Sequence, residues 1–238
     1  MASLYGTHLP SIEIIDDIRG SGSGESVNFS KWFALGDSLT EVNFRASDNY
    51  ASYIADELGI TLENLGHSGC GYMKTANSNN FRTEINEITG YNYNTDIITV
   101  MGSINDFSYL ATALGELGDT GTDTIYGCMY NFFADLQTAY MGVRLGVITL
   151  PPAGTNRDTF FANANLYNTA LKETAKLFDV PVLDLTYSCN LKPWESNFRN
   201  EFYSADGTGG SGQVDDTHPN SKGHWLIHSK IKEFLKTL

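Results

Sequence analysis

The chain has 238 residues, 41% of them hydrophobic and only 18% charged, so it can bury a full core and is too apolar for wholesale disorder. Its 15 basic and 28 acidic side chains leave a net charge of −13, a field that repels nucleic-acid backbones and anionic membrane surfaces. No segment approaches the ~20 apolar residues of a membrane span. We therefore expect no nucleic-acid partner and no membrane insertion.

Residues 1–30 differ in composition from the rest of the chain. They begin with MASLYGTHLP, without the cationic start and apolar core of a signal peptide, and they contain GSGSG at 20–24, which is typical of a flexible linker. The IEIID segment between these two could add an edge strand. We expect a leader and linker at 1–30, which could derive from a larger multidomain protein, followed by one domain at 31–238.

From residue 31 onward, apolar strands alternate with amphipathic helices. Strands are predicted at 32–35, 60–66, 96–102, 143–152 and 181–185, and helices at 50–58, 80–88, 124–141, 157–178 and 225–238. The strands are apolar throughout, as parallel strands are when both faces of their sheet are covered. This pattern predicts a three-layer α/β/α sandwich around a flavodoxin-like parallel five-stranded sheet in the order 2-1-3-4-5.

Polar residues gather where the predicted strands end. Strand one ends in GDS at 36–38, strand two in NLGHSGCG at 64–71, and strand three in GSINDF at 102–107, while VDDTHP at 214–219 precedes the last helix. In such sheets, ligands bind beyond the carboxyl ends of the strands. The four segments supply a hydroxyl nucleophile, donors for a negatively charged oxygen, and a histidine with a carboxylate three residues before it.

With GDSLT, NLGHSG, GSIND and DDTHP in this order, the chain resembles the GDSL/SGNH hydrolase family over residues 31–238. The resemblance implies a serine esterase that needs no cofactor. Ser38 would attack the ester carbonyl, His218 would act as its general base, and Asp215 would orient His218.

The resemblance also implies an oxyanion hole made of the Ser38 amide, the Gly69 amide and the Asn105 side chain. One residue departs from the family pattern. Ser103 stands where the family usually has a glycine two residues before the asparagine, with Gly102 one position earlier. We therefore expect the turn before Asn105 to be shaped differently.

Neighbouring groups could take the same roles. Asp216 competes with Asp215 as the orienting carboxylate, although the spacing to the histidine favours Asp215. Asp37 is expected to form structural hydrogen bonds near the turn. His67 is expected to pack in its turn or to contact substrate.

No metal site is expected. His224 and His228 are four residues apart on the last helix, but no third ligand has suitable spacing, so two surface or half-buried histidines are expected. The three cysteines (Cys70, Cys128 and Cys189) form no metal-type pair, and reduced structural cysteines are the expectation.

The substrate is the least determined feature of the sequence. Tyr72 and Phe107 could line an acyl pocket, and Trp194, in an aromatic loop at 186–214, could form a substrate wall. A short acyl ester on a carbohydrate is the leading hypothesis, with a small-molecule or glycan ester as partner. A lipid esterase or thioesterase is one alternative, and a non-catalytic glycan-binding or adhesion module of a surface or phage protein is another. The compartment stays open.

Overall fold

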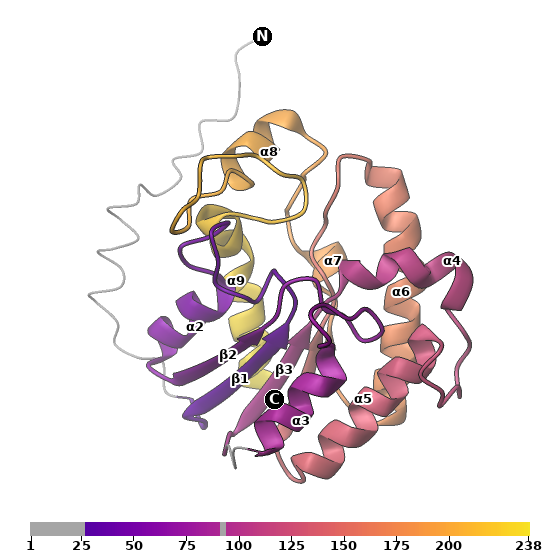
Figure 1. Ribbon diagram of the computed structural model, residues 1–238. Helices are drawn as coiled ribbons and strands as arrows, with labels where there is room; N and C mark the ends of the chain where they lie inside the picture. The colour runs from indigo at the N-terminus through magenta and orange to yellow at the C-terminus, as the bar shows by residue number, and fades with distance from the viewer. Residues whose placement is uncertain (1–26, 91–93) are drawn as a thin grey trace.

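A parallel sheet forms the centre of the computed structural model, which describes residues 27–90 and 94–238 (Figure 1). The strands are β1 (Lys31–Gly36), β2 (Thr61–Gly66), β3 (Ile97–Met101), β4 (Arg144–Ile148) and β5 (Val182–Leu183). They pair in the order β2-β1-β3-β4-β5, and every pairing is parallel. The predicted order and direction of the strands are confirmed.

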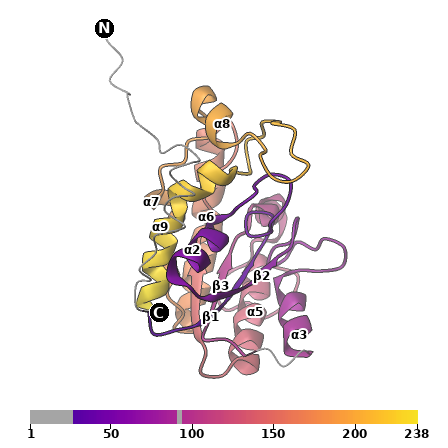
Figure 2. The same cartoon turned by 90° about the vertical axis from the view of Figure 1, so that its left-hand side faces the viewer.

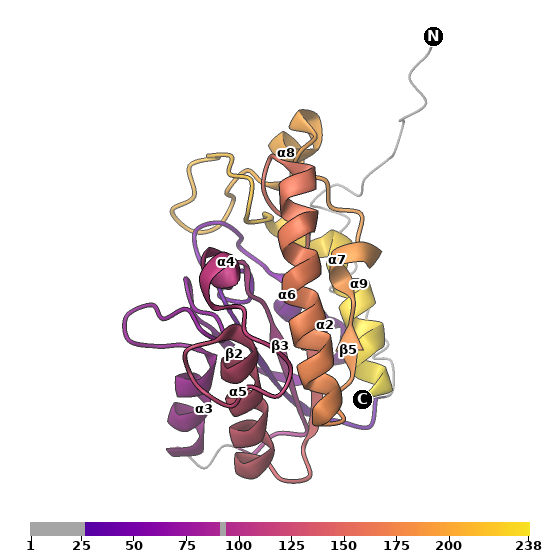
Figure 3. The same ribbon diagram turned by 90° about the vertical axis from the view of Figure 1, so that its right-hand side faces the viewer.

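Helices cover both faces of this sheet, and together they make three layers (Figures 1, 2 and 3). They are α2 (Tyr50–Leu58), α3 (Phe81–Gly90), η1 (Ile104–Tyr109), α4 (Leu110–Ala113), α5 (Ile125–Ala139), α6 (Arg157–Leu177), α7 (Leu185–Ser188), α8 (Ser196–Phe202) and α9 (Ser221–Thr237). None of the helices in the described residues is long and apolar enough to cross a membrane.

Successive residues of each strand serve different layers. In β1, Phe33 and Leu35 join the core under α3, α5 and α6, whereas Trp32 and Ala34 join the core under α2 and α9. Side chains alternate across a strand, so a sheet covered on both sides needs apolar residues at every position. The continuous apolar runs in the sequence have this cause.

The strands end level with one another. Gly36 at the end of β1 pairs with Gly66 of β2 and with Met101 of β3, which in turn pairs with Ile148 of β4. The segments that follow these strands therefore leave the sheet at one edge. This register brings residues from distant parts of the chain to a common site.

Several predicted boundaries differ from the structure. The last helix begins at Ser221 rather than at residue 225, because the Asn220 side chain caps it by accepting from the Gly223 amide at 3.0 Å. β4 ends at Ile148, before the prolines that were included in the predicted strand. The segment 186–214, expected to be a loop, contains most of α7 and all of α8. The predicted linker and leader strand lie outside the described residues.

His224 on α9 gives the fold a pH-dependent term. Its side chain is 3% exposed, and burial, with the His218 charge, lowers its pKa to about 3. The unfolded chain binds a proton below the ordinary pKa of 6.5, whereas the folded chain does not. Stability from this group is therefore complete above that pKa and is lost as the pH falls toward 3.

We expect the free energy of unfolding to drop by about 2 kcal/mol through this group between roughly pH 7.5 and pH 5. Urea denaturation of the wild type and of His224→Leu over this range measures the effect. The variant is expected to show a flatter pH dependence, and equal slopes for the two proteins would contradict the assignment.

Candidate active site

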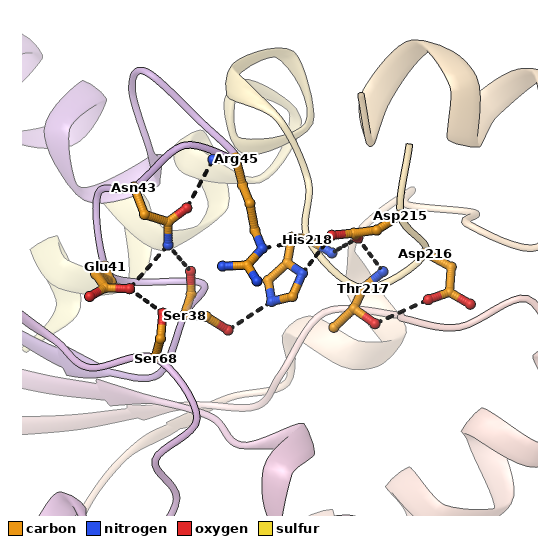
Figure 4. Close-up of polar contacts among 9 residues, drawn as sticks. All are labelled: Ser38, Glu41, Asn43, Arg45, Ser68, Asp215, Asp216, Thr217 and His218. Atoms are coloured by element: carbon orange, nitrogen blue, oxygen red, sulfur yellow. Dashed lines mark hydrogen bonds and ion pairs between the residues drawn. The ribbon is translucent and has the colours of Figure 1, made fainter. Parts of the chain in front are cut away.

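Ser38, His218 and Asp215 lie in one hydrogen-bonded line beyond the end of β1 (Figure 4). The Ser38 Oγ is 2.8 Å from His218 Nε2, and His218 Nδ1 is 2.8 Å from Asp215 Oδ2. When Nδ1 carries the proton and donates it to the carboxylate, Nε2 is left as an acceptor for the serine hydroxyl. A neutral imidazole held in this tautomer can remove the serine proton.

Asp215 is fixed by the backbone of its own turn. Its Oδ1 accepts from the amides of Thr217 at 2.8 Å and His218 at 2.7 Å. Burial acts to raise the pKa of Asp215, but the hydrogen bonds and charge of His218 and the Thr217 amide outweigh it, so the pKa is lower than usual. The carboxylate therefore stays charged and aimed at the imidazole.

Asp216 points away from this line. Its Oδ2 accepts from the Thr155 amide at 3.2 Å, and its Oδ1 accepts from the Thr217 hydroxyl at 3.2 Å. It thus ties the 214–219 turn to the segment after β4. Of the two neighbouring carboxylates, the structure brings only Asp215 to His218.

A buried polar network lies directly beneath the serine. Asp37 is fully buried, accepts from the Leu39 amide at 2.9 Å, and lies 2.7 Å from the Ser103 hydroxyl. Asp106 accepts from the hydroxyl of Tyr167 at 2.9 Å and from the amides of residues 72–74. Burial raises the pKa of both carboxyl groups. The network joins the segments that follow β1, β2 and β3.

Ser103 is part of this network, and this gives the unexpected serine a function that glycine could not have. Its hydroxyl lies 2.7 Å from both the Asp37 carboxylate and the Cys70 carbonyl, and it accepts from the Asn105 amide at 3.1 Å. The Tyr167 hydroxyl accepts from the Ser103 amide at 2.9 Å. The altered turn is therefore held by side-chain hydrogen bonds.

The three expected oxyanion donors lie at the same edge but differ in their bonding. Among the described residues, the amides of Ser38 and Gly69 donate to no acceptor. The Asn105 side chain is engaged, because its Nδ2 lies 2.8 Å from the Cys70 carbonyl and 3.0 Å from Ser103 Oγ. Gly69 has a φ of +83°, which favours glycine.

Residues 34–226 match the model of the GDSL-like lipase/acylhydrolase family. The chain belongs to this family. The match runs from the second half of β1 through the first part of α9 and therefore includes all four segments at the strand ends. No curated protein matches the chain.

Solved structures share the fold at low sequence identity. A Lactobacillus plantarum protein has a TM-score of 0.72 and 23% identity, over 89% of this chain and 99% of that one. An inhibitor-bound Mycobacterium smegmatis aryl esterase has a TM-score of 0.61 and 15% identity, over 88% and 99% of the two chains. A carbohydrate acetylesterase from Sinorhizobium meliloti has a TM-score of 0.59 and 15% identity, over 87% and 99%.

The three aromatic residues proposed for substrate binding lie in different surroundings. Tyr72 is 1% exposed and packs edge-on against Phe81, so its ring belongs to the core. Phe107 on η1 is half-buried, with its ring 5.7 Å from that of Tyr167. Trp194 packs against Phe161 of α6, at a ring separation of 5.7 Å.

His67, Cys70 and Glu84 are the one group of three potential metal ligands found in the described residues, with ligand atoms within 4.8 Å of one another. Protein groups lie close to two of these ligand atoms. His67 Nδ1 is 3.3 Å from Glu84 Oε1, and the Cys70 thiol donates to the Asn79 carbonyl at 3.0 Å. Burial raises the pKa of Cys70 to about 11, which opposes the thiolate that a metal needs.

The histidines of α9 are more buried than the sequence predicted. His224 is 3% exposed and His228 is 5% exposed. His228 Nε2 lies 3.0 Å from Glu57 Oε1 on α2, so this residue links the two helices on one face of the sheet. The expectation of surface or half-buried positions was wrong, because α2 covers this face of α9.

Sequence reasoning missed a polar rim beside Ser38, made of Glu41, Asn43, Arg45 and Ser68 (Figure 4). Asn43 Nδ2 donates to Glu41 Oε2 at 3.1 Å, and the Ser68 hydroxyl donates to the same oxygen. Arg45 Nε is 3.7 Å from Asp215 Oδ2. The rim joins the segment after β1 to the turn after β2, a contact for which the sequence carries no periodic signal.

Proposed function

We propose that the protein hydrolyses carboxylic esters through an acyl-enzyme formed on Ser38. The observation that carries this proposal is the line of two 2.8 Å contacts from Ser38 Oγ through His218 to Asp215. Family membership gives it a second, independent support. Serine hydrolases on unrelated folds use the same geometry, because an ordinary serine hydroxyl needs an adjacent oriented base.

In the proposed reaction, His218 Nε2 takes the hydroxyl proton while Ser38 Oγ bonds to the ester carbon. The carbonyl oxygen becomes an oxyanion, which the amides of Ser38 and Gly69 can stabilise because no acceptor in residues 27–90 and 94–238 uses their protons. His218 then gives the proton to the leaving alcohol. Water attacks the acyl-enzyme by the same steps, and the acid and free Ser38 are regenerated.

Asn105 is the proposed third oxyanion donor. Turning one Nδ2 proton from Ser103 Oγ to the oxyanion would exchange a neutral acceptor for a charged one, which makes the stronger hydrogen bond. We therefore expect Asn105→Ala to lower kcat for 4-nitrophenyl acetate about 10²- to 10³-fold, with a much smaller change in KM.

Ser103→Ala separates this role from packing, because it removes the support of Asn105 but leaves its amide group. We expect it to lower the free energy of unfolding by about 1–3 kcal/mol, with a smaller loss of kcat than in Asn105→Ala. A kcat loss below about tenfold in Asn105→Ala would show that Asn105 does not stabilise the oxyanion.

We further propose that the natural ester carries a short acyl group, most simply acetyl, on a carbohydrate. The rim of Glu41, Asn43, Arg45 and Ser68 supports this, because carboxylate, amide and hydroxyl groups bind the hydroxyls of a polar alcohol. The fold is also found in a carbohydrate acetylesterase and in a family two carbohydrate esterase solved with cellohexaose.

A substrate panel tests both parts of the proposal. Hydrolysis of acetylated oligosaccharides is compared with that of 4-nitrophenyl esters of increasing acyl length, and mass spectrometry locates the acyl group trapped on the chain. We expect the label on Ser38 and a sharp fall in kcat/KM beyond acetyl or propionyl. A label elsewhere would contradict the mechanism, and a preference for eight carbons or more would indicate a lipid substrate.

A further inference from the structure

The Arg45 side chain lies beside Asp215 in the candidate active site. It extends from the segment between β1 and α2 toward His218 (Figure 4). Its Nε is 3.7 Å from Asp215 Oδ2, and its side chain is 24% exposed. A permanent positive charge therefore lies next to Asp215, the carboxylate that is bonded to the proposed base.

The donors of this guanidinium are mostly unused. Within the described part of the chain, its Nε is buried without a hydrogen-bond partner, and no acceptor is found for its terminal nitrogens. Its other contact is with the exposed ring of Phe44, 4.6 Å from the guanidinium carbon. A buried donor without a hydrogen-bond partner is unfavourable, so the arrangement favours a ligand that supplies acceptors.

The backbone holds Arg45 in place. Its amide donates to Asn43 Oδ1 at 2.9 Å, and its carbonyl accepts from the Asp206 amide at 3.2 Å. The neighbouring Phe44 carbonyl accepts from the Gly207 amide at 3.1 Å. The backbone of the Arg45 segment is thus tied to the segment that leads to Asp215, so the two segments keep their relative positions.

Acidic groups nearby already have partners. Asp215 accepts from His218 and Thr217, and Glu41 accepts from Asn43 and Ser68. The net charge of −13 opposes anions at long range, but screening limits that field to about 8 Å at physiological salt. Asp215 lies 3.7 Å from Arg45 Nε and offsets part of its charge, so within the described residues the terminal nitrogens of Arg45 are the donors left for a ligand.

From these contacts we infer that Arg45 binds a carboxylate of the substrate, so that esters bearing a negative charge near the scissile bond are preferred. A planar guanidinium matches a carboxylate through two parallel hydrogen bonds, which gives both strength and orientation. This inference rests on the proposed function, because it names the class of ester that the same site would hydrolyse.

Matched ester pairs test the inference. 4-Acetoxybenzoate and 4-acetoxybenzamide differ in charge on the alcohol side, and 4-nitrophenyl hydrogen adipate and 4-nitrophenyl hexanoate differ in charge on the acyl side. We expect the wild type to prefer the charged member of one pair about tenfold or more in kcat/KM. In Arg45→Gln the ratio of kcat/KM for the charged ester to that for the neutral ester is expected to fall toward one. In Arg45→Lys this ratio is expected to lie between those of the wild type and Arg45→Gln.

Added salt is expected to reduce the preference of the wild type, because a charge contact at a partly exposed site is screened. Circular dichroism checks that the variants are folded. The absence of preference in both pairs would overturn the inference. An equal loss on charged and neutral esters in Arg45→Gln would also overturn it, because that result indicates a structural role.

Binding to Ser38→Ala, measured by calorimetry, tests the inference without turnover. We expect 4-acetoxybenzoate to bind more tightly than the benzamide, and the difference to disappear when Arg45→Gln is added. If the wild type hydrolyses no ester faster than Ser38→Ala but this binding difference is present, the proposed function fails and the role of Arg45 stands. Equal binding of the two ligands would overturn the role of Arg45.

Discussion

Replacement of Ser38 by alanine is expected to lower kcat for 4-nitrophenyl acetate about 10⁶-fold, the scale of loss when a triad serine is removed. The substitution takes away the attacking oxygen and leaves His218 without a hydroxyl at 2.8 Å. Substrate binding and the free Ser38 and Gly69 amides stay, so a small rate above that of water is expected to survive. Initial rates at saturating ester, measured after confirming the fold by circular dichroism, give the value.

Ser68→Ala is the matched control for this substitution. Ser68 lies at the same edge of the sheet, but its hydroxyl donates to Glu41 rather than to a histidine. With 4-nitrophenyl acetate, whose leaving group has no further hydroxyls for the rim to bind, we expect this variant to stay within about tenfold of the wild type. If Ser38→Ala kept more than about one hundredth of the wild-type kcat, the Ser38 hydroxyl would not be the nucleophile.

The architecture could be predicted from the sequence because a strand that is buried on both faces of a sheet is apolar at successive positions. Residues such as Phe33 and Ala34 serve opposite cores, so β1 reads as an unbroken apolar run. Helices with one buried stripe, such as α2, show the complementary periodicity. Together these patterns fix the alternation of strand and helix, which leaves few possible topologies.

Helix ends were less accessible, because they depend on single hydrogen bonds. The start of α9 is set by the Asn220 cap, and Gly223 in its first turn resembles a helix breaker in the sequence. In the structure, a Cβ at Gly223 would lie 2.6 Å from the Pro219 side chain, so the glycine allows the close turn after His218. Gly223 therefore permits the helix to begin directly after Asn220.

The polar residues of the site likewise include some that could be predicted from the sequence and some that could not. Ser38, Asp215 and His218 could be proposed from sequence because each lies in a short segment that resembles a family pattern. Arg45 and Tyr167 could not, since their importance comes from contacts across the fold, such as the 2.9 Å contact between the Tyr167 hydroxyl and Asp106. Such contacts depend on how loops pack, which apolar periodicity does not encode.

Replacement of Asp215 by asparagine is expected to lower kcat for 4-nitrophenyl acetate about 10⁴-fold, with little change in KM. The asparagine amide can donate to His218 Nδ1, which would place the imidazole proton on Nε2, the atom that lies 2.8 Å from Ser38 Oγ. A protonated Nε2 cannot accept the serine proton. Asparagine preserves the size and backbone contacts of Asp215. The loss of kcat therefore measures the effect of the His218 tautomer and of the Asp215 charge.

Asp216→Asn is the control, because it makes the same chemical change at the next residue. Asp216 contacts Thr155 and Thr217 but not His218, and we expect its variant to keep kcat within about tenfold. Equal losses in the two variants would indicate that both act through the shape of the 214–219 turn. A large loss confined to Asp215→Asn would instead require the direct bond from this carboxylate to the imidazole, which only Asp215 can supply among the described residues.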